Sequence, residues 1–374
     1  MKILQKSALL RKLSKHLPYS LRVRIKRIAI SLGKFQTDSY ISWIRECDTL
    51  SEQDYRAIDR HIMALEYKPL ISVIMPTYET PEWALREAID SIKGQLYPKW
   101  ELCVADDASP SLHVEKILRD AAAVDSRIRW MRRERNGNIS AASNSAISLA
   151  TGEFIALMDH DDVLSPRALY EVVVALNKNP RLDVIYSDED QIDKNGQRHT
   201  PYFKTDWNID LLLSQNMISH LGVYRRSLVE HVGGFREGFE GSQDYDLALR
   251  CADATLVDRV HHIPAILYHW RRDFGTASYS ERKLEACWDA ARRAIAEHLH
   301  RCNEKGRVGP HPKRPMWSRV NRMVPEPAPL VSLIVSGRDE HFLERCVSGL
   351  LYRTNYPQVE LLIADQEGGS FQTH

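Results

Sequence analysis

Apolar runs and amphipathic stretches alternate along the chain from Pro69 onward. Residues 70–76 (LISVIMP) form a continuous apolar run, which is typical of a strand buried on both faces. Residues 85–92 then place apolar side chains on one face of a helix, with Pro81 at its first position. The same alternation predicts further strands at 100–107, 127–133, 153–158 and 182–190, and helices at 140–150 and from 165. This order favours an α/β fold with a mixed, mainly parallel sheet flanked by helices.

Polar residues follow three of these strands at their carboxyl ends. They are residues 76–79 (PTYE), the pair Asp106 and Asp107, and residues 159–162 (DHDD). In an open α/β sheet these strand ends share one edge, and ligands bind in the crevice there. The topology therefore predicts one acidic crevice, assembled from segments that lie far apart in the sequence, and a nucleotide with a divalent cation would suit it.

The stretch 153–166 (EFIALMDHDDVLSP) ends an apolar run with three aspartates in four positions, Asp159, Asp161 and Asp162. Their mutual repulsion is unfavourable unless positive charge lies nearby. One interpretation is a solvated turn that caps the helix beginning at Ser165. The other is a metal site, because closely spaced carboxylates suit Mg²⁺ or Mn²⁺, which prefer oxygen ligands and often share coordination with substrate phosphates.

Residues 69–109 and 329–370 form a partial internal repeat. Each begins Pro-Leu, continues through an apolar strand, a helix and a Tyr-Pro turn, and reaches a second strand that closes with Ala-Asp. We expect the later copy to be the truncated start of a second domain, although two unrelated strand–helix beginnings could coincide. The predicted organisation is a basic helical region at 1–66, a main domain at 67–300, a proline-rich linker at 301–328 and the truncated copy at 329–374.

Charge is unevenly distributed along the chain. Residues 1–37 hold ten Lys or Arg and no acidic residue, whereas the remainder holds 41 basic and 50 acidic residues. This basic stretch also carries apolar residues at helical spacing, so it could lie on an anionic membrane surface. A packed terminal helix or a disordered tail would give the same pattern. An acidic body argues against a nucleic-acid partner, and no apolar run is long enough to span a bilayer.

The six cysteines indicate free thiols. They lie at positions 47, 103, 251, 287, 302 and 346, with no C-x-x-C pair and no histidine cluster that completes a zinc pattern. We therefore expect a reducing, cytoplasmic setting.

Seven ordered motifs between residues 69 and about 280 resemble the family 2 glycosyltransferases, which have the GT-A fold. The similarity is greatest to bacterial enzymes that build cell-surface polysaccharides, often as tandem domains. The motifs are PTYE (76–79), ADDAS (105–109), NGNISAASNSA (136–146), MDHDD (158–162), YSDED (186–190), GSQDYDLALR (241–250) and HIPAILYHWR (262–271).

This resemblance implies roles for individual residues. A nucleotide-sugar donor would contact residues from several motifs: Pro76, Thr77, Tyr78, Glu79, Asp106, Asp107, Asn138, Asp159 and Arg271. A divalent cation, Mn²⁺ or Mg²⁺, would be held by Asp159, Asp161 and His269. The alternatives are a turn cap for Asp106 and Asp107, and an ordinary packed side chain for His269.

The resemblance also places the catalytic base at Asp244, with Gln243 where the family more commonly has Glu. A charge favoured by a helix N-terminus would explain Asp244 equally simply. Asp246 is expected to be structural and to pair with Arg250 one helical turn later. Asp188 and Asp190 would lie at the rim near the acceptor, or in a solvated loop.

The sequence thus predicts a metal-dependent, inverting glycosyltransferase that uses a UDP- or dTDP-linked sugar. The acceptor would be a glycan or a lipid-linked glycan for cell-surface polysaccharide, and the protein would be peripheral at the inner face of the membrane. The alternative is a non-catalytic nucleotide-sugar-binding module or a degenerate remnant of a tandem enzyme. A nucleotidyltransferase is disfavoured, because residues 76–83 (PTYETPEW) lack the Gly and Lys that bind a triphosphate.

Overall fold

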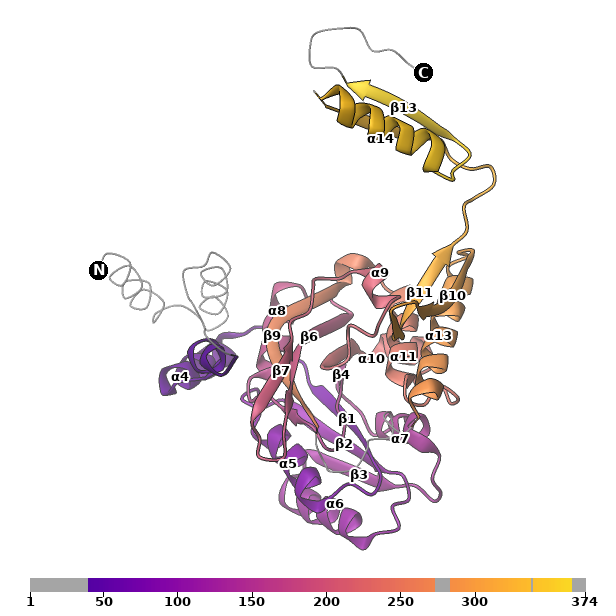
Figure 1. Ribbon diagram of the computed structural model, residues 1–374. Helices are drawn as coiled ribbons and strands as arrows, with labels where there is room; N and C mark the ends of the chain where they lie inside the picture. Colours follow the sequence, from indigo (N-terminus) through magenta and orange to yellow (C-terminus); the bar gives the residue numbers. More distant parts are fainter. Residues whose placement is uncertain (1–39, 273–282, 338, 365–374) are drawn as a thin grey trace, which may run out of the picture. The chain divides into compact units, whose positions relative to one another are not determined.

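The computed structural model describes residues 40–272, 283–337 and 339–364, which form two compact units (Figure 1). The larger unit runs to Glu304 and also includes Val308–Val320, and the smaller unit begins properly at Asn321. The basic stretch 1–37 lies outside the described residues. None of the described helices combines the length and apolar character that a bilayer crossing requires.

The larger unit is built on one mixed sheet with the order β3-β2-β1-β4-β8-β6-β9-β5, and β7 is added on β6. Strands β1, β2, β3 and β4 are parallel, as are β6 and β9, whereas β8 is antiparallel to both β4 and β6. The strands are β1 (Ile71–Thr77), β2 (Trp100–Asp106), β3 (Ile128–Arg132), β4 (Phe154–Leu157), β5 (Val163–Leu164), β6 (Val184–Ile192), β7 (Arg198–Tyr202), β8 (Gly222–Arg225) and β9 (Val260–Arg271). The predicted α/β fold is confirmed.

Helices cover both faces of this sheet, which explains why its central strands are apolar on both sides. On β1, Val73 and Met75 pack into one core, while Ile74 packs into the other. The first core also receives α5 (Glu82–Lys93), α6 (Leu112–Val124) and α8 (Ala168–Lys178). The second receives α7 (Asn138–Ile147), α9 (Ile209–Leu212), α10 (Arg226–His231), α11 (Gln243–Asp253) and α13 (Leu284–Arg301), and a 3₁₀ turn, η2 (Val257–Arg259), precedes β9.

The predicted boundary between residues 66 and 67 is wrong. Helix α4 (Glu52–Ala64) begins at a capping box on Ser51, and its Ile58 and Ile62 are buried in the first core. The short helix α3 (Tyr40–Trp43) and the π-helical turn η1 (Ile44–Asp48) pack against β9 through Ile266. Residues 40–66 therefore belong to the main unit, because each full burial of such an apolar side chain stabilises it by about 1.5–3 kcal/mol.

The predicted linker at 301–328 also needs correction. Strands β10 (Gly306–His311) and β11 (Arg314–Arg322) form a two-stranded sheet within it. Val308 and Val320 pack against the second core, and the Ser318 amide donates to the Ser214 carbonyl at 2.9 Å. The prolines that suggested a linker fall partly on these strands, which is compatible with pairing on one side only.

The smaller unit contains β12 (Val331–Ser336), α14 (Glu340–Arg353) and β13 (Val359–Ala364). Its two strands are parallel, with Val331 opposite Val359, and repeat the order of β1, α5 and β2. Several of its large apolar side chains are exposed: Leu330, Ile334, Phe342, Leu351 and Tyr352. A sheet of two strands with one helix leaves part of its apolar surface uncovered.

Candidate active site

The acidic loop that follows β4 is fastened to β9. The Tyr268 hydroxyl accepts from the Asp159 amide at 3.1 Å and donates to Asp162 Oδ2 at 2.5 Å, and the Arg271 amide donates to Asp162 Oδ1 at 2.6 Å. Asp162 is fully buried, and this desolvation, followed by the charges of Asp161 and Asp159, raises its pKa well above the usual range. Asp162 is therefore the anchor of the loop, and not an additional cation ligand.

A cleft beside this loop brings together two carboxylates that are distant in sequence. Asp159 and Asp244 both line it, together with Pro76, His220 and Gln243. Asp244 lies in the first turn of α11, where the helix dipole favours a negative charge. The β1 end, the acidic loop and the GSQDYD motif therefore meet at this cleft, whereas Asp106 and Asp107, which were predicted to share a crevice with the first two, do not line it.

The Asp244 carboxylate is oriented by one neighbour. Asn216 Nδ2 donates to Asp244 Oδ2 at 2.8 Å, and no other described residue hydrogen-bonds this carboxylate. Gln243 Oε1 accepts from the Gly241 amide at 2.8 Å, which fixes the turn before α11. One oxygen of Asp244 therefore remains available to accept a proton in the cleft.

Sequence analysis missed His220, which lies beside Asp159. Its Nε2 is 3.7 Å from Asp159 Oδ2, and its ring stacks on Tyr268 with centroids 4.7 Å apart. Burial raises the pKa of Asp159, and the His220 charge opposes this shift. The placement follows from register, since Ala156 of β4 pairs with Val223 of antiparallel β8. Extending that register brings His220 opposite Asp159. The sequence predicted a mainly parallel sheet and no antiparallel strand at 222–225, so it could not predict this pairing.

A hydrogen-bonded chain connects the end of β1 with the acidic loop. Thr77 Oγ1 lies 2.6 Å from Thr80 Oγ1, which lies 2.9 Å from His160 Nδ1. The same His160 nitrogen is 3.9 Å from Asp161 Oδ1. Thr77 is buried, so it supports the loop and does not present its hydroxyl to a ligand.

The residues of the loop fit a hard cation. Among the described residues, none donates a hydrogen bond to the carboxylate of Asp159 or Asp161, and each carboxylate has only a histidine at 3.7 to 3.9 Å. About a third of the Asp159 side chain (36%) remains exposed in the cleft. Two adjacent carboxylates with open oxygens are the donor set that Mn²⁺ and Mg²⁺ prefer.

His269 does not fit the predicted ligand role. Successive side chains of a strand point to opposite faces, and both neighbours of His269, Tyr268 and Trp270, contact His220. His269 faces the other way, where its Nδ1 lies 2.5 Å from Asp190 Oδ1. Within the described part of the chain, its ligand atoms are not gathered with those of Asp159 and Asp161.

Asp188 and Asp190 are not at a rim. β6 continues through both residues, and both side chains are buried. Asp188 Oδ1 accepts from the Lys204 amide at 2.9 Å and lies 2.8 Å from His262 Nε2. Asp190 is bound by His269 and by Arg198. Burial alone would raise the pKa of Asp190, but the hydrogen bond with His269, together with the Arg198 charge, holds it below the usual range. Both carboxylates stabilise the sheet.

Arg271 is committed within the protein, contrary to the prediction that it faces a diphosphate. Its Nε donates to the Asp161 carbonyl at 2.8 Å, and its Nη2 lies 2.5 Å from Glu87. The guanidinium also lies over the Trp83 ring, 4.8 Å from the centroid. Only 1% of its side chain is exposed, so Arg271 stabilises the acidic loop through buried contacts and does not face the cleft.

Three of the residues predicted to bind the donor after β1 and β2 have carboxylates that are hydrogen-bonded within the protein. Glu79 caps α6 by accepting from the Ser111 amide at 2.8 Å, and buried Asp106 accepts from the Ser109 amide at 3.1 Å. The Asp107 carboxylate is likewise occupied, by Arg133 and by the Gly137 amide at 3.0 Å. For Asp106 and Asp107, the structure supports the turn-cap alternative over direct donor contact, and the Glu79 carboxylate is likewise engaged within the protein.

Tyr78 and Asn138 are predicted donor residues that are exposed, as Glu79 also is. Tyr78 is 45% exposed and follows cleft-lining Pro76 by two positions. Asn138 is the first residue of α7, and the next residue, Ile139, lines the cleft. No acidic residue and no side-chain cap occupies the first turn of α7.

A known family has the same sequence pattern. The profile of Glycosyl transferase family 2 matches residues 72–233 of this chain, from β1 to the end of α10. Residues 72–233 therefore form a glycosyl transferase family 2 domain. The matched segment contains the β1 end, the acidic loop and His220, while Asp244 follows it.

Two curated relatives of this chain are much longer than the region that aligns with it. The uncharacterized protein y4gI of Sinorhizobium fredii is 45% identical over 310 residues, which are 81% of this chain and 33% of that protein. The O-antigen biosynthesis protein RfbC of Myxococcus xanthus is 37% identical over 325 residues, 87% of this chain and 25% of that protein. The chain thus spans a quarter to a third of their length. The structure of S. aureus TarS 1-349 in complex with UDP-GlcNAc aligns with a TM-score of 0.49 and 20% identity, over 62% of this chain and 66% of that one.

Proposed function

We propose that the main unit transfers a sugar from a nucleotide-diphosphate donor to a glycan or lipid-linked glycan acceptor in cell-surface polysaccharide synthesis. Family membership supports the class of reaction. One observation carries the assignment of residues: Asp159 and Asp244 line the same cleft. This reaction needs two components: a pair of carboxylates that binds the cation, and a separate carboxylate that accepts the proton of the acceptor hydroxyl.

In this proposal Asp159 and Asp161 would hold Mn²⁺ or Mg²⁺. When bound, such a cation neutralises the charge that develops on the departing diphosphate. Asp244 accepts the proton of the acceptor hydroxyl as the hydroxyl attacks the sugar, and Asn216 keeps the carboxylate aimed during this step. Attack opposite the leaving group inverts the anomeric centre.

The donor would extend from the acidic loop toward the start of α7. The Asn136 side chain accepts from the Asn138 amide, so the next amides in the first turn of α7, together with the helix dipole, would bind an anionic diphosphate. Tyr78, which is exposed directly after the β1 end, would stack on the base of the donor. We propose a UDP- or dTDP-linked sugar. Residues 1–37 would keep the protein peripheral to the inner face of the membrane, through their ten basic residues.

A donor hydrolysis assay with matched variants tests this function. We expect turnover of a UDP- or dTDP-sugar that requires Mn²⁺ or Mg²⁺, since Asp244 can activate water as it activates an acceptor. Asp244→Asn should lower turnover by about 10²–10⁴-fold while Mn²⁺-dependent UDP binding persists. Asp161→Asn should lose both. Asp120→Asn on the exposed face of α6 makes the same chemical change and should match the parent.

Two outcomes would contradict the proposal in different ways. Undiminished turnover in Asp161→Asn would remove the cation from the mechanism. Metal-dependent UDP binding in the parent, without turnover of any donor, would favour the alternative of a non-catalytic nucleotide-sugar-binding module or degenerate remnant.

A further inference from the structure

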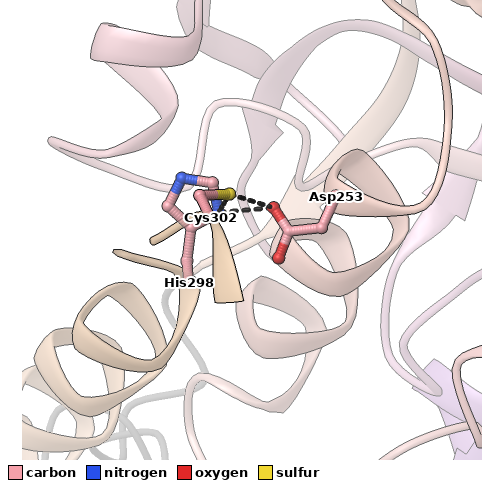
Figure 2. A group of neighbouring side chains, drawn as sticks. All are labelled: Asp253, His298 and Cys302. Carbon is pink, nitrogen blue, oxygen red and sulfur yellow. Dashed lines mark hydrogen bonds and ion pairs between the residues drawn. The ribbon is translucent and has the colours of Figure 1, made fainter. Parts of the chain in front are cut away.

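A second group of potential metal ligands lies at the other end of α11 (Figure 2). Asp253 is the last residue of α11, and His298 and Cys302 lie one turn apart at the end of α13. His298 is buried, Asp253 is half-buried and Cys302 is exposed. The group is therefore accessible from solvent on one side and supported by protein on the other.

The three side chains converge on one point. Asp253 Oδ1 lies 2.5 Å from His298 Nδ1 and 3.6 Å from Cys302 Sγ, and Sγ lies 3.9 Å from the same Nδ1. A nucleophilic triad would need the thiol and the carboxylate on different imidazole nitrogens. Here both face Nδ1, so the arrangement is that of ligands around a common centre.

The spacing is close to that of a tetrahedral zinc site. Zn²⁺ bonds of about 2.0–2.3 Å place ligand atoms about 3.3–3.6 Å apart. The two distances to Cys302 Sγ, 3.6 and 3.9 Å, nearly meet this requirement. Only the hydrogen bond between His298 and Asp253, at 2.5 Å, would have to open, by about 0.8 Å relative to that geometry.

The position at the end of α11 also favours a cation. A carboxylate at a helix C-terminus is opposed by the helix dipole, so Asp253 gains from positive charge beside it. Arg301 Nε donates to Asp253 Oδ2 at 2.6 Å, which fixes the carboxylate and leaves Oδ1 directed at His298 and Cys302. This resembles the outer hydrogen bonds that orient carboxylate ligands in metal sites.

We propose that Asp253, His298 and Cys302 bind one Zn²⁺, with water at the fourth position. Binding releases the thiol proton of Cys302 and requires the neutral His298 tautomer with its proton on Nε2. A site with thiolate and imidazole ligands selects zinc over Mg²⁺ or Mn²⁺, so it is distinct from the carboxylate loop at Asp159. The ion would connect the C-termini of α11 and α13, about 13 Å along α11 from Asp244.

Cobalt substitution on the untagged full-length protein tests this site. After removal of metals with a chelator, Co²⁺ should give a thiolate-to-metal charge-transfer band at one equivalent, which one equivalent of Zn²⁺ abolishes and excess Mg²⁺ leaves unchanged. Cys302→Ser should lose the band. Cys346→Ser, at the other exposed thiol, should keep it. Asp161→Asn should also keep it, so failure of this site and failure of the transferase site are distinguishable.

A second measurement needs no substitution. Zn²⁺ should slow the alkylation of Cys302 by at least about tenfold, as followed by peptide mass spectrometry, because a metal-bound thiolate is a poor nucleophile. Alkylation of Cys346 should be unchanged and serves as the internal control. Absence of the cobalt band in the parent, its persistence in Cys302→Ser, or unprotected Cys302 would each overturn the proposal and leave only a hydrogen-bonded cluster.

Discussion

Asp159 is the residue whose protonation we expect to govern cation binding. Although about a third of its side chain (36%) is exposed in the cleft, the burial of the remainder raises the pKa of Asp159 most. The negative charges of Asp161 and Asp244 raise this pKa further, whereas His220 and His160 lower it. A carboxylate must be deprotonated to bind a cation. As the pH falls, Asp159 takes up its proton while an ordinary carboxylate, with a pKa near about 3.9, is still ionised.

This ordering gives a prediction about pH. Mn²⁺-dependent UDP binding should weaken on acidification at a pH above the ordinary carboxyl range. Asp244→Asn removes a charge that raises the Asp159 pKa, so the midpoint of this loss should move to lower pH. Calorimetric titration at a series of pH values measures the midpoint, with Asp120→Asn as control. A midpoint that stays fixed or rises in Asp244→Asn would contradict the assignment.

His220 gives a second prediction at this scale. Its contact with Asp159 suggests that it orients or completes the cation site. His220→Asn should therefore raise the Mn²⁺ concentration needed for half-maximal UDP binding by about 10–100-fold. His341→Asn, on the exposed surface of α14, is the matched control. An unchanged Mn²⁺ requirement would mean that His220 only packs against Tyr268.

Among elements, α11 contains a buried cluster of charges. Asp246, buried in its first turn, is bound by Arg250 Nε at 2.9 Å and by Arg236. The expected pairing of Asp246 with Arg250 is thus confirmed. Since α11 also presents Asp244 to the cleft, this cluster fixes the position of the proposed base.

Breaking this cluster should strongly destabilise the fold. Asp246→Ala leaves the buried Arg250 guanidinium without its carboxylate and should lower the free energy of unfolding by about 3–5 kcal/mol. Arg86→Ala removes an exposed pair with Glu82 on α5 and should change it by less than about 1 kcal/mol. Urea denaturation compares the two. Similar losses would show that burial does not decide the contribution of these pairs.

Differences between sequence-based expectation and structure also arise at the scale of elements. The acidic loop was proposed as a cation site because clustered charge directly after an apolar strand is unfavourable without a cation, whereas Asp244 was chosen from the family resemblance and not from the physics of the sequence. Asp188 and Asp190 lie on the strand predicted at 182–190, but the family resemblance placed them at a rim, and apolar periodicity does not reveal that the polar end of this strand is buried. Its carboxylates are buried against cations from neighbouring strands, such as Arg198 on β7. His220 depends on the antiparallel register of β8, which periodicity does not encode.

At the scale of the whole molecule, the two units differ in how much of their apolar surface is buried. In the main unit, hairpin β10–β11 covers part of the second core. In the smaller unit, Ile334 is 75% exposed and Tyr352 is 83% exposed among the described residues. Exposed apolar surface of this kind promotes association with other molecules.

A shortened chain that ends at Arg322, without the smaller unit, tests whether the main unit is stable and active by itself. It retains β10 and β11, so it should melt at the temperature of the parent's main transition and hydrolyse donor at the parental rate. It should also bind less of the dye ANS, since the exposed side chains of the smaller unit are gone. A chain that ends at Arg301 is the contrasting control, because loss of the hairpin uncovers the second core. Equal behaviour of the two truncated chains would contradict a structural role for the hairpin.

The hydroxyl of Tyr268 has a consequence for the thermodynamics of ligand capture. By bonding both the Asp159 amide and the Asp162 carboxylate, it holds the acidic loop in one conformation before any ligand arrives. A nucleotide would then lose its own freedom on docking but would not have to order this segment of backbone. The conformational entropy lost on nucleotide binding should accordingly be smaller than at a site whose loop becomes ordered only when the ligand binds.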